Sequence, residues 1–369
     1  MRVLHIIARF NVGGTATWIT NLSEELVRMG HEVHLLAGEV ESNEKEDERF
    51  SVLGGIRIKG LSRRVSMFSD LNSIFEIRKQ IRAIKPDVIN THTAKAGVVG
   101  RIANLLLFSR KAPIVHTVHG HLLTGYFSKR KVKVIIIIER VMAKFTDLIL
   151  FAGLKVAEDC LAVGIGDPNH MGIVRPGLKP ISFAPRSSLR FTYAIKEDEM
   201  VVGWLARFTQ VKRPDLVIAL AERFPNVSFL LGGDGELLGE MTLRAPRNCK
   251  FLGWVEPQSF WSACDLALLT SENEAVPISL IEAQMSGLPA LATNAGSTSE
   301  VVIPSFTGWI VDVSIESLSK GLSLVIESKD LNTFGQNAKS YSSEMFSIEK
   351  HASDHLRYYE IAKGETRIS

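Results

Sequence analysis

Short apolar runs rich in β-branched residues alternate with amphipathic stretches along most of the chain. In the first half, strands are predicted at 3–8, 32–37, 87–91, 113–118 and 147–151, and helices at 16–29, 68–84, 96–108 and 129–144. Near-continuous apolar strands separated by helices are typical of a parallel sheet that is covered on both faces. The pattern therefore predicts a doubly wound α/β domain.

The same alternation stops once and then restarts. Residues 176–198 contain three prolines and little periodicity, which predicts a linker. Further strands are predicted at 200–206, 227–232, 250–252, 265–269 and 289–293. We therefore expect two Rossmann-like, doubly wound parallel-sheet domains that face a cleft, with ligands at the carboxyl ends of the strands.

The expected domain limits follow from these predictions. The first domain is expected to span 1–175, the linker 176–198 and the second domain 199–345. A closing helical stretch is predicted from about 331 to 363. Its last part, 346–369, is expected to form a C-terminal helix that can pack back on the first domain.

The composition fits a folded protein of this kind. The chain has 369 residues, of which 46% are apolar and 22% charged, enough for two globular domains. Its three cysteines are far apart and form no CxxC motif, so neither a disulfide framework nor a zinc site is expected. The N-terminus lacks the features of a signal peptide, and the longest apolar run, 132–138, is too short to span a bilayer. We expect a cytoplasmic protein.

The charge is distributed unevenly. Residues 1–180 carry 26 Lys and Arg against 17 Asp and Glu, and residues 57–144 carry 18 against 4, a net charge of +14. Such a block favours an anionic partner, which could be a phosphate-rich ligand, an acidic membrane surface or nucleic acid. A basic surface that is merely solvated is the alternative.

Two glycines follow the first predicted strand. Gly13 and Gly14 stand between that strand and the next predicted helix. Glycine lets the backbone approach a ligand closely, and the N-terminus of a helix offers free N–H groups to a phosphate. A glycine pair at such a turn is also compatible with a purely structural role.

Two cations follow the first predicted strand of the second domain. Arg207 and Lys212 lie in the loop ahead of a predicted helix. At the carboxyl end of a strand they could neutralise a leaving diphosphate. Two exposed basic side chains without such a role are the alternative.

A pair of carboxylates eight residues apart is the strongest chemical signal. Pro277 suits the first turn of a helix, which puts Glu274 in the preceding loop and Glu282 on the second turn. Glu282 is flanked by apolar residues, and a buried carboxylate is costly unless a partner or ligand compensates it. A carboxylate on an ordinary surface helix is the alternative.

The run 271–289, with its E-x7-E spacing, resembles the signature of the family 4 glycosyltransferases, which have the GT-B fold. Ala292-Thr293 and Glu300 extend the resemblance, and further motifs occur in family order over nearly the whole chain. They are the Gly13-Gly14 loop, Thr117-Val118-His119-Gly120-His121, the Arg207 and Lys212 pair, Gly232-Gly233-Asp234-Gly235 and Phe251-Leu252-Gly253.

The resemblance implies a role for each matching position in the second domain. Arg207 and Lys212 would hold the diphosphate of a nucleotide sugar, and Glu282 would hydrogen-bond the ribose. Glu274 would contact the transferred sugar as a positioning and electrostatic group. Further substrate contacts are expected from Gly233, from the base-reading strand end with Phe251 and Leu252, and from backbone groups of Val276, Pro277 and Ile278.

In the first, acceptor-binding domain, the resemblance assigns Gly13 and Gly14 to the phosphates, His119 to the donor sugar, and His121 to substrate binding. His92 is a second-rank candidate, and His116, inside a predicted strand, is interpreted as structural. Family members retain the anomeric configuration, by front-face attack in which the leaving phosphate accepts the acceptor's proton. The implied activity is transfer of a hexosyl or N-acetylhexosaminyl group, with a UDP-sugar favoured as donor.

No cofactor or metal ion is expected. The chain lacks the Asp-x-Asp triplet with which GT-A transferases hold a divalent cation, and the resemblance implies that Arg207 and Lys212 replace that charge. The implied acceptor is a glycan or a lipid-linked sugar in bacterial cell-envelope polysaccharide assembly. No nucleic-acid partner is expected, because only five aromatic residues are interleaved with the basic block.

The segment 126–140 combines aromatic, basic and aliphatic residues, as an interfacial membrane helix does. A core helix is the competing explanation. We expect a buried isoleucine end at 135–138 and an exposed basic N-terminal end, which would allow peripheral binding to the inner face of the cytoplasmic membrane.

Three other functions compete with glycosyl transfer. A nucleotide-sugar epimerase could share the architecture, and an inactive sugar- or nucleotide-binding relative could share the pocket. A dinucleotide-dependent oxidoreductase is disfavoured because the GxGxxG motif is missing.

Overall fold

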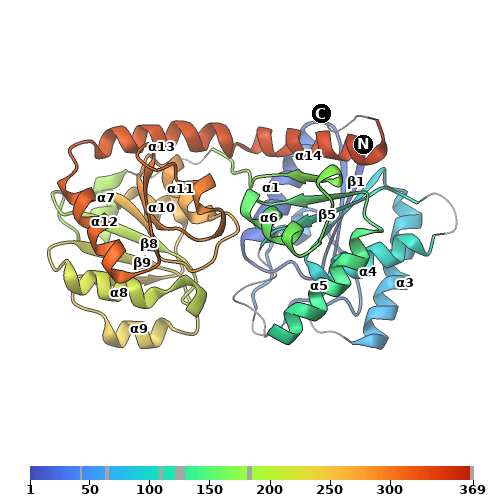
Figure 1. Ribbon diagram of the computed structural model, residues 1–369, viewed down its shortest axis with the longest axis horizontal. Helices are drawn as coiled ribbons and strands as arrows, with labels where there is room; N and C mark the ends of the chain where they lie inside the picture. The colour runs from blue at the N-terminus through green and yellow to red at the C-terminus, as the bar shows by residue number, and fades with distance from the viewer. Residues whose placement is uncertain (42–43, 63–65, 108–110, 121–128, 181–184, 366–369) are drawn as a thin grey trace. The chain divides into compact units, whose positions relative to one another are not determined.

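The computed structural model describes residues 1–41, 44–62, 66–107, 111–120, 129–180 and 185–365. The chain forms two compact units, each built around one parallel sheet. Unit 1 comprises Met1–Gly177 together with Ile348–Ser369, and unit 2 comprises Leu178–Ser347. Two sheets with helices on their faces agree with the expected pair of Rossmann-like domains (Figure 1).

The sheet of unit 1 has seven strands in the order β3-β2-β1-β4-β5-β6-β7. The strands are β1 (Arg2–Ile7), β2 (Glu32–Ala37), β3 (Ile56–Arg57), β4 (Val88–His92), β5 (Ile114–Val118), β6 (Leu148–Phe151) and β7 (Met171–Ile173). The helices are α1 (Gly14–Arg28), α2 (Arg49–Val52), α3 (Met67–Ile84), α4 (Ala94–Leu105), α5 (Lys129–Ala143), α6 (Leu154–Ala162) and α14 (Ile348–Lys363).

The sheet of unit 2 has six strands in the order β10-β9-β8-β11-β12-β13. The strands are β8 (Val201–Leu205), β9 (Ser228–Gly232), β10 (Cys249–Gly253), β11 (Leu266–Leu269), β12 (Ala290–Thr293) and β13 (Gly308–Val311). The helices are α7 (Arg186–Thr192), α8 (Pro214–Arg223), α9 (Leu238–Arg244), α10 (Pro257–Ser262), α11 (Ile278–Met285), α12 (Ile315–Glu327) and α13 (Leu331–Met345).

Alternate residues of each strand pack against opposite helix layers. In β1, Val3 and Ile7 belong to the core under α1 and α14, whereas Leu4 and Ile6 belong to the core under α3 and α4. This alternation follows from the two-residue repeat of a strand. It explains why the strands read as continuous apolar runs in the sequence.

The ten predicted strands all form, within two residues of their expected ends. Three strands were not predicted, namely β3, β7 and β13, and they have two to four residues each. Each of these three strands forms one edge of its sheet, and β10 forms the remaining edge. Such short runs carry too few apolar positions to stand out in the sequence.

The segment 176–198 does not behave as a linker over most of its length. From Leu178 onward it belongs to unit 2, and it includes α7. Arg190 of α7 is fully buried and donates hydrogen bonds of 2.8–2.9 Å to backbone carbonyls at 196, 197 and 199. It also pairs with Asp265 at 2.7 Å. These bonds hold the segment on the sheet of unit 2.

The predicted closing helix, 331–363, is divided at Phe346. Its first part, α13, packs on α11 in unit 2. Its second part, α14, belongs to unit 1 and lies beside α1 (Figure 1). The chain therefore crosses to unit 2 and returns to complete unit 1. Among the described helices, none combines the length and apolarity needed to span a bilayer.

Candidate active site

The carboxyl edge of the unit 2 sheet brings together three of the predicted residues. Arg207 follows β8 and is exposed, and Lys212 lies in the short helical turn before α8. Glu274 lies in the loop between β11 and α11, as expected. Since β8 and β11 are neighbours in the sheet, the loops that follow them meet at one edge.

Glu274 is held by two partners. Its Oε1 lies 2.5 Å from the Lys212 ammonium and accepts a hydrogen bond of 2.6 Å from the Ser271 hydroxyl. The Glu274 side chain is only 8% exposed. Burying a carboxylate is costly unless a cation or hydrogen-bond donors compensate it. Lys212 and Ser271 supply both.

The two loops are joined by further bonds. The Thr270 hydroxyl donates to the backbone carbonyl of Lys212 at 2.8 Å, and the backbone N–H of Glu272 donates to the carbonyl of Val211 at 2.9 Å. These bonds bring the Lys212 loop against the Glu274 loop. Two hydrogen bonds between the loops therefore support the pairing of Lys212 and Glu274.

Pro277 occupies the N-cap position of α11 rather than its first turn, which begins at Ile278. The first N–H groups of a helix have no acceptor within it and carry its positive dipole end. Val276 and Ile278 thus bring backbone N–H donors to the same edge as Glu274, whereas Pro277 has no N–H to donate. An anionic group can be bound there.

Glu282 lies one turn into α11 and does not contact the Lys212–Glu274 pair. Burial raises the pKa of the Glu282 carboxyl to about 8, the nearby Trp261 indole opposes this increase, and the charge of Glu256 adds to it. The carboxyl is therefore largely protonated at neutral pH in this state. Such a group can both donate and accept hydrogen bonds.

Three other predicted positions of unit 2 are shaped by packing. Gly233 has a φ of +122°, and a Cβ there would lie 2.0 Å from the carbonyl oxygen of Ala206. The side chains of Phe251 and Leu252 pack into the two cores of the unit, Phe251 against Phe208 at 5.9 Å between ring centroids. Both side chains are only partly buried, so this strand end offers backbone groups as well as part of two apolar side chains.

The predicted residues of unit 1 lie at the carboxyl edge of its sheet. Gly13 and Gly14 are exposed at the start of α1, and no atom lies within 4 Å of a Cβ placed on Gly13. His119 follows β5, and its ring meets Trp18 of α1 edge-on with 4.8 Å between ring centroids. Trp18 lies one turn into α1, so its contact with His119 brings that histidine close to the Gly13-Gly14 loop at the start of the helix. His121 lies outside the described residues.

Sequence reasoning missed several residues that support these groups. Ser271 was not singled out as a partner of Glu274, nor His5, His351 and His355 as neighbours of His119. For His5 the signal was available, because it stands at a position of β1 that faces the same core as Val3 and Ile7. The positions of His351 and His355 depend on the return of α14 to unit 1.

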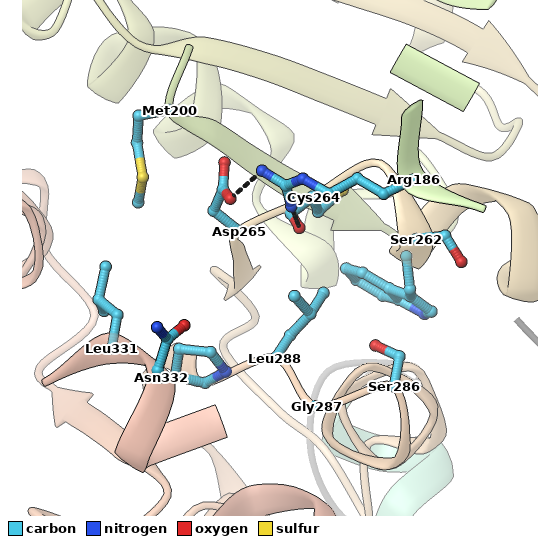
Figure 2. A pocket seen from close by; sticks show the side chains of 12 residues that line it. Arg186, Met200, Ser262, Cys264, Asp265, Ser286, Gly287, Leu288, Leu331 and Asn332 are labelled. Atoms are coloured by element: carbon cyan, nitrogen blue, oxygen red, sulfur yellow. Dashed lines mark hydrogen bonds and ion pairs between the residues drawn. The ribbon is translucent and has the colours of Figure 1, made fainter. Parts of the chain in front are cut away.

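No group of three or more His, Cys, Asp or Glu among the described residues has an arrangement suited to a metal ion. A pocket of about 440 Å³ lies elsewhere, at the amino ends of β8, β11 and β12 (Figure 2). Arg186 and Asp265 both line it and pair at 2.5 Å, and no predicted site residue lines it. It is distinct from the carboxyl edge that holds Glu274.

Helix α5 differs from the expectation for its isoleucines. Ile137 and Ile138 are 60% and 41% exposed, so the expected buried end is wrong for these two residues, and only Ile135 and Ile136 are half-buried. The inner face of α5 holds Glu139, which pairs with the fully buried Arg101 of α4 at 3.0 Å. The outer face is apolar for about two turns, from Val134 to Val141.

The comparisons with known proteins agree with this architecture. The family model "Glycosyltransferase Family 4" matches residues 12–180, and the model "Glycosyl transferases group 1" matches residues 185–341. A similar curated protein is the UDP-Gal:α-D-GlcNAc-diphosphoundecaprenol α-1,3-galactosyltransferase of Escherichia coli. It is 27% identical over 309 residues, which cover 79% of each chain.

Two solved structures share the fold over nearly the full length. Sucrose-phosphate synthase of Thermosynechococcus elongatus has a TM-score of 0.84 at 18% identity and covers 99% of this chain and 100% of its own. HepE of Anabaena, solved in complex with UDP, has a TM-score of 0.80 at 20% identity and covers 97% and 99%. With two family models matching in order over most of its length, the chain belongs to the family 4 glycosyltransferases, which have the GT-B fold.

Proposed function

We propose that the protein transfers a hexosyl or N-acetylhexosaminyl group from a UDP-sugar to a lipid-linked sugar, with retention of the anomeric configuration and without a metal ion. The observation that carries the proposal is the Lys212–Glu274 pair ahead of the N-terminus of α11. A cation, a carboxylate and free backbone donors at one edge suit a diphosphate beside a sugar.

Different residues of unit 2 bind different parts of the donor. Arg207 and Lys212 neutralise the diphosphate, and the backbone at the start of α11 adds hydrogen bonds to the leaving phosphate. Glu274 hydrogen-bonds the sugar near its anomeric carbon. Glu282 accepts hydrogen bonds from the ribose hydroxyls.

The reaction exchanges one bond at the anomeric carbon. The bond from this carbon to the phosphate oxygen breaks, and the oxygen of the acceptor hydroxyl bonds to the carbon on the same face. The acceptor's proton moves to the leaving phosphate oxygen. Arg207 and Lys212 stabilise the negative charge that grows on the diphosphate as the bond breaks.

A lipid-linked acceptor is supported by the name of the Escherichia coli relative, whose acceptor is a sugar on diphosphoundecaprenol. Such an acceptor is held at a membrane. The outer face of α5 offers exposed Val134, Ile137, Ile138 and Val141, with exposed Arg130, Lys131, Lys133 and Lys144 near its two ends. We propose that this face binds an anionic lipid surface.

A second apolar row in the same helix layer supports membrane binding. On α3, the exposed side chains Met67, Phe68, Leu71 and Phe75 follow one face of the helix. Both α3 and α5 pack against α4 (Figure 1). Exposed aromatic and aliphatic side chains flanked by cations are characteristic of helices that lie in a membrane interface.

The first experiment measures thermal stabilisation by UDP, GDP, ADP and NAD, for the wild type and for Arg207→Ala. A ligand at a hundred times its Kd stabilises the folded state by roughly 2.7 kcal/mol. We expect UDP to stabilise the wild type and the effect to be lost in Arg207→Ala. Stabilisation by NAD alone would contradict the proposal.

The second experiment follows transfer itself. The protein is incubated with a UDP-hexose and a short-chain prenyl-diphospho-N-acetylglucosamine, with and without EDTA. We expect a product one hexose heavier, with the donor's anomeric configuration in its NMR coupling constants and no loss of rate in EDTA. Inversion, dependence on a divalent cation, or epimerisation of the donor without transfer would each overturn the corresponding part of the proposal.

A further inference from the structure

Three histidines form a hydrogen-bonded chain inside unit 1. His5 comes from β1, His92 from the end of β4 and His119 from just beyond β5, and these strands are neighbours in the sheet. Nδ1 of His5 lies 2.9 Å from Nε2 of His92, and Nδ1 of His92 lies 2.7 Å from Nε2 of His119. The chain runs from the fully buried His5 to the carboxyl edge, where residue His119 is partly exposed.

The chain lies beneath two helices, α1 and α14, which are side by side (Figure 1). Trp18 of α1 meets His119 edge-on, and α14 brings His351 and His355 against Trp18. His5, His92 and His355 have no exposed surface. Within the part of the chain that the structure describes, the other groups that act electrostatically on the chain are the histidines His116 and His355, and no carboxylate is among them.

This buried environment keeps the imidazole rings uncharged. Burial lowers the pKa of His5 and of His119 to about 3 and that of His355 to about 4, and it holds the pKa of His92 well below its usual value. A histidine that lacks a carboxylate partner has no compensation for a buried positive charge. His119 is therefore neutral throughout the physiological range of pH.

Neutral imidazoles in a chain must all donate in the same direction. Each ring has one N–H and one lone pair, so His92 donates to one neighbour and accepts from the other. At the inner end, Nε2 of His5 has no partner among the described residues. A buried N–H without a partner is rarer in proteins than a buried acceptor without one. Either direction leaves one end N–H without a partner among the described residues, on Nε2 of His5 or on Nδ1 of His119. The two ends differ in access, because His5 has no exposed surface whereas residue His119 is partly exposed at the carboxyl edge. We therefore place the hydrogen of His5 on Nδ1, so that the chain donates from His5 through His92 to His119.

This direction puts the hydrogen of His119 on Nδ1, which is also buried without a partner among the described residues. Because residue His119 is partly exposed at the carboxyl edge, a ligand oxygen that reaches Nδ1 after a displacement of its surroundings can accept this hydrogen bond. A neutral N–H donor suits the hydroxyl of a sugar. Diphosphate is better held by cations.

We propose that His5 and His92 are positioning residues, which fix the tautomer of His119 and make it a neutral hydrogen-bond donor to a hydroxyl oxygen of a bound sugar. The part that concerns the sugar rests on the proposed function. The hydroxyl could belong to the donor or to the acceptor, and the experiments below distinguish these two sources.

The first test needs no substrate. The protein is labelled with ¹⁵N-histidine, and the ring nitrogens of His119 are followed by NMR between pH 5.5 and 8.5, with His119→Asn for assignment. We expect one neutral tautomer with its hydrogen on Nδ1 and no titration. A His119 that titrates near pH 6.5, or that carries its hydrogen on Nε2, would overturn the proposal whether or not the protein is a transferase.

The second test compares His92→Asn, His92→Leu and His116→Asn. Asparagine can replace the Nδ1–H that His92 donates to His119, whereas leucine cannot. His116 is an equally buried control on the opposite face of the sheet, where its Nδ1 contacts the Thr91 hydroxyl at 2.9 Å. For each variant, the Kd of UDP and the KM values of UDP-sugar and acceptor are measured.

We expect His92→Leu to leave the Kd of UDP unchanged and to raise the KM of one sugar substrate about 5- to 30-fold, the loss of one hydrogen bond. The substrate whose KM increases identifies the source of the hydroxyl. His92→Asn and His116→Asn should resemble the wild type. Equal effects in His92→Leu and His116→Asn, or a parallel loss of UDP binding, would count against the positioning role. If UDP fails to bind the wild type, the proposed function fails, while the NMR result still decides the tautomer.

Discussion

The ammonium of Lys212 and the carboxylate of Glu274 are in contact, at 2.5 Å, although 62 residues separate them in the chain. Without a bound ligand, the charges of these two side chains neutralise each other. A diphosphate that binds Lys212 competes with Glu274 for that cation. The carboxylate would then be available to a sugar hydroxyl, and we propose that this ion pair couples nucleotide binding to sugar binding.

Substituting Lys212 and substituting Glu274 should affect UDP binding, stability and kcat differently. Lys212→Ala leaves the buried Glu274 with Ser271 as its remaining partner, so we expect weaker UDP binding and a loss of about 1–3 kcal/mol in the free energy of unfolding. Glu274→Gln frees Lys212, so we expect UDP binding to be retained or tightened while kcat falls on the order of 100-fold or more. Isothermal titration and steady-state rates measure both.

A suitable control for the ion pair is Arg223→Ala. Arg223 forms an exposed contact with Glu316 at 3.3 Å, and exposed pairs contribute little. Its Tm, UDP binding and kcat should stay at wild-type values. If Glu274→Gln weakened UDP binding as strongly as it lowered kcat, the proposed competition for Lys212 would be wrong.

Glu282 should make the stability of unit 2 depend on pH. Its folded-state pKa is about 8, above the ordinary value of 4.5. Between these values the folded state keeps a proton that the unfolded state loses, so the free energy of unfolding decreases as pH rises through this window. The decrease should total roughly 1–3 kcal/mol, and Glu282→Gln should remove it.

Urea unfolding at pH 5, 6.5 and 8.5 measures this effect. Tryptophan fluorescence is a suitable signal because four of the five tryptophans lie in unit 2. At pH 8.5 the Glu282→Gln variant should be more stable than the wild type. Identical pH dependence in the two proteins would show that Glu282 ionises in the folded state as it does in water.

Gly233 should be needed for folding rather than for ligand contact. Gly233 has a positive φ, and a Cβ there would collide with the Ala206 carbonyl. We therefore expect Gly233→Ala to lower the free energy of unfolding of unit 2 by about 2 kcal/mol or more. Gly239, on α9, has open space around a Cβ, so Gly239→Ala should be neutral or slightly stabilising. Thermal unfolding compares them. A Gly233→Ala protein of normal Tm that fails to bind UDP would instead indicate a direct role in binding.

The outer face of α5 should bind anionic lipid. Each cation near such a surface contributes roughly 1 kcal/mol, and the exposed isoleucines add apolar burial. We expect the protein to sediment with phosphatidylglycerol vesicles at low salt but not with phosphatidylcholine vesicles. The double variant Ile137→Glu and Ile138→Glu should lose at least five-fold in affinity. Val52→Glu, at an exposed apolar position on α2, is the matched control; equal loss in both would remove α5 as the binding face.

Much of the fold could be predicted because the strands are buried on both faces and therefore read as apolar runs. The strand at 32–37 forms with the predicted ends, and Glu274 lies in the predicted loop before α11. The short edge strands gave no comparable signal. The isoleucines of α5 misled the prediction, because their apolar character does not tell whether they face the sheet or the solvent.

The sequence by itself determined which segments become strands and helices, and which chemical groups stand at strand ends, because both depend on neighbours within a few residues. The tertiary structure alone decided which of those groups meet. The contact of Lys212 with Glu274 and the chain from His5 to His119 depend on the order of strands in each sheet. The return of α14 to unit 1 adds His351 and His355 to that core. Strand order and helix docking depend on packing between residues far apart in the chain, and a local sequence pattern does not predict such packing.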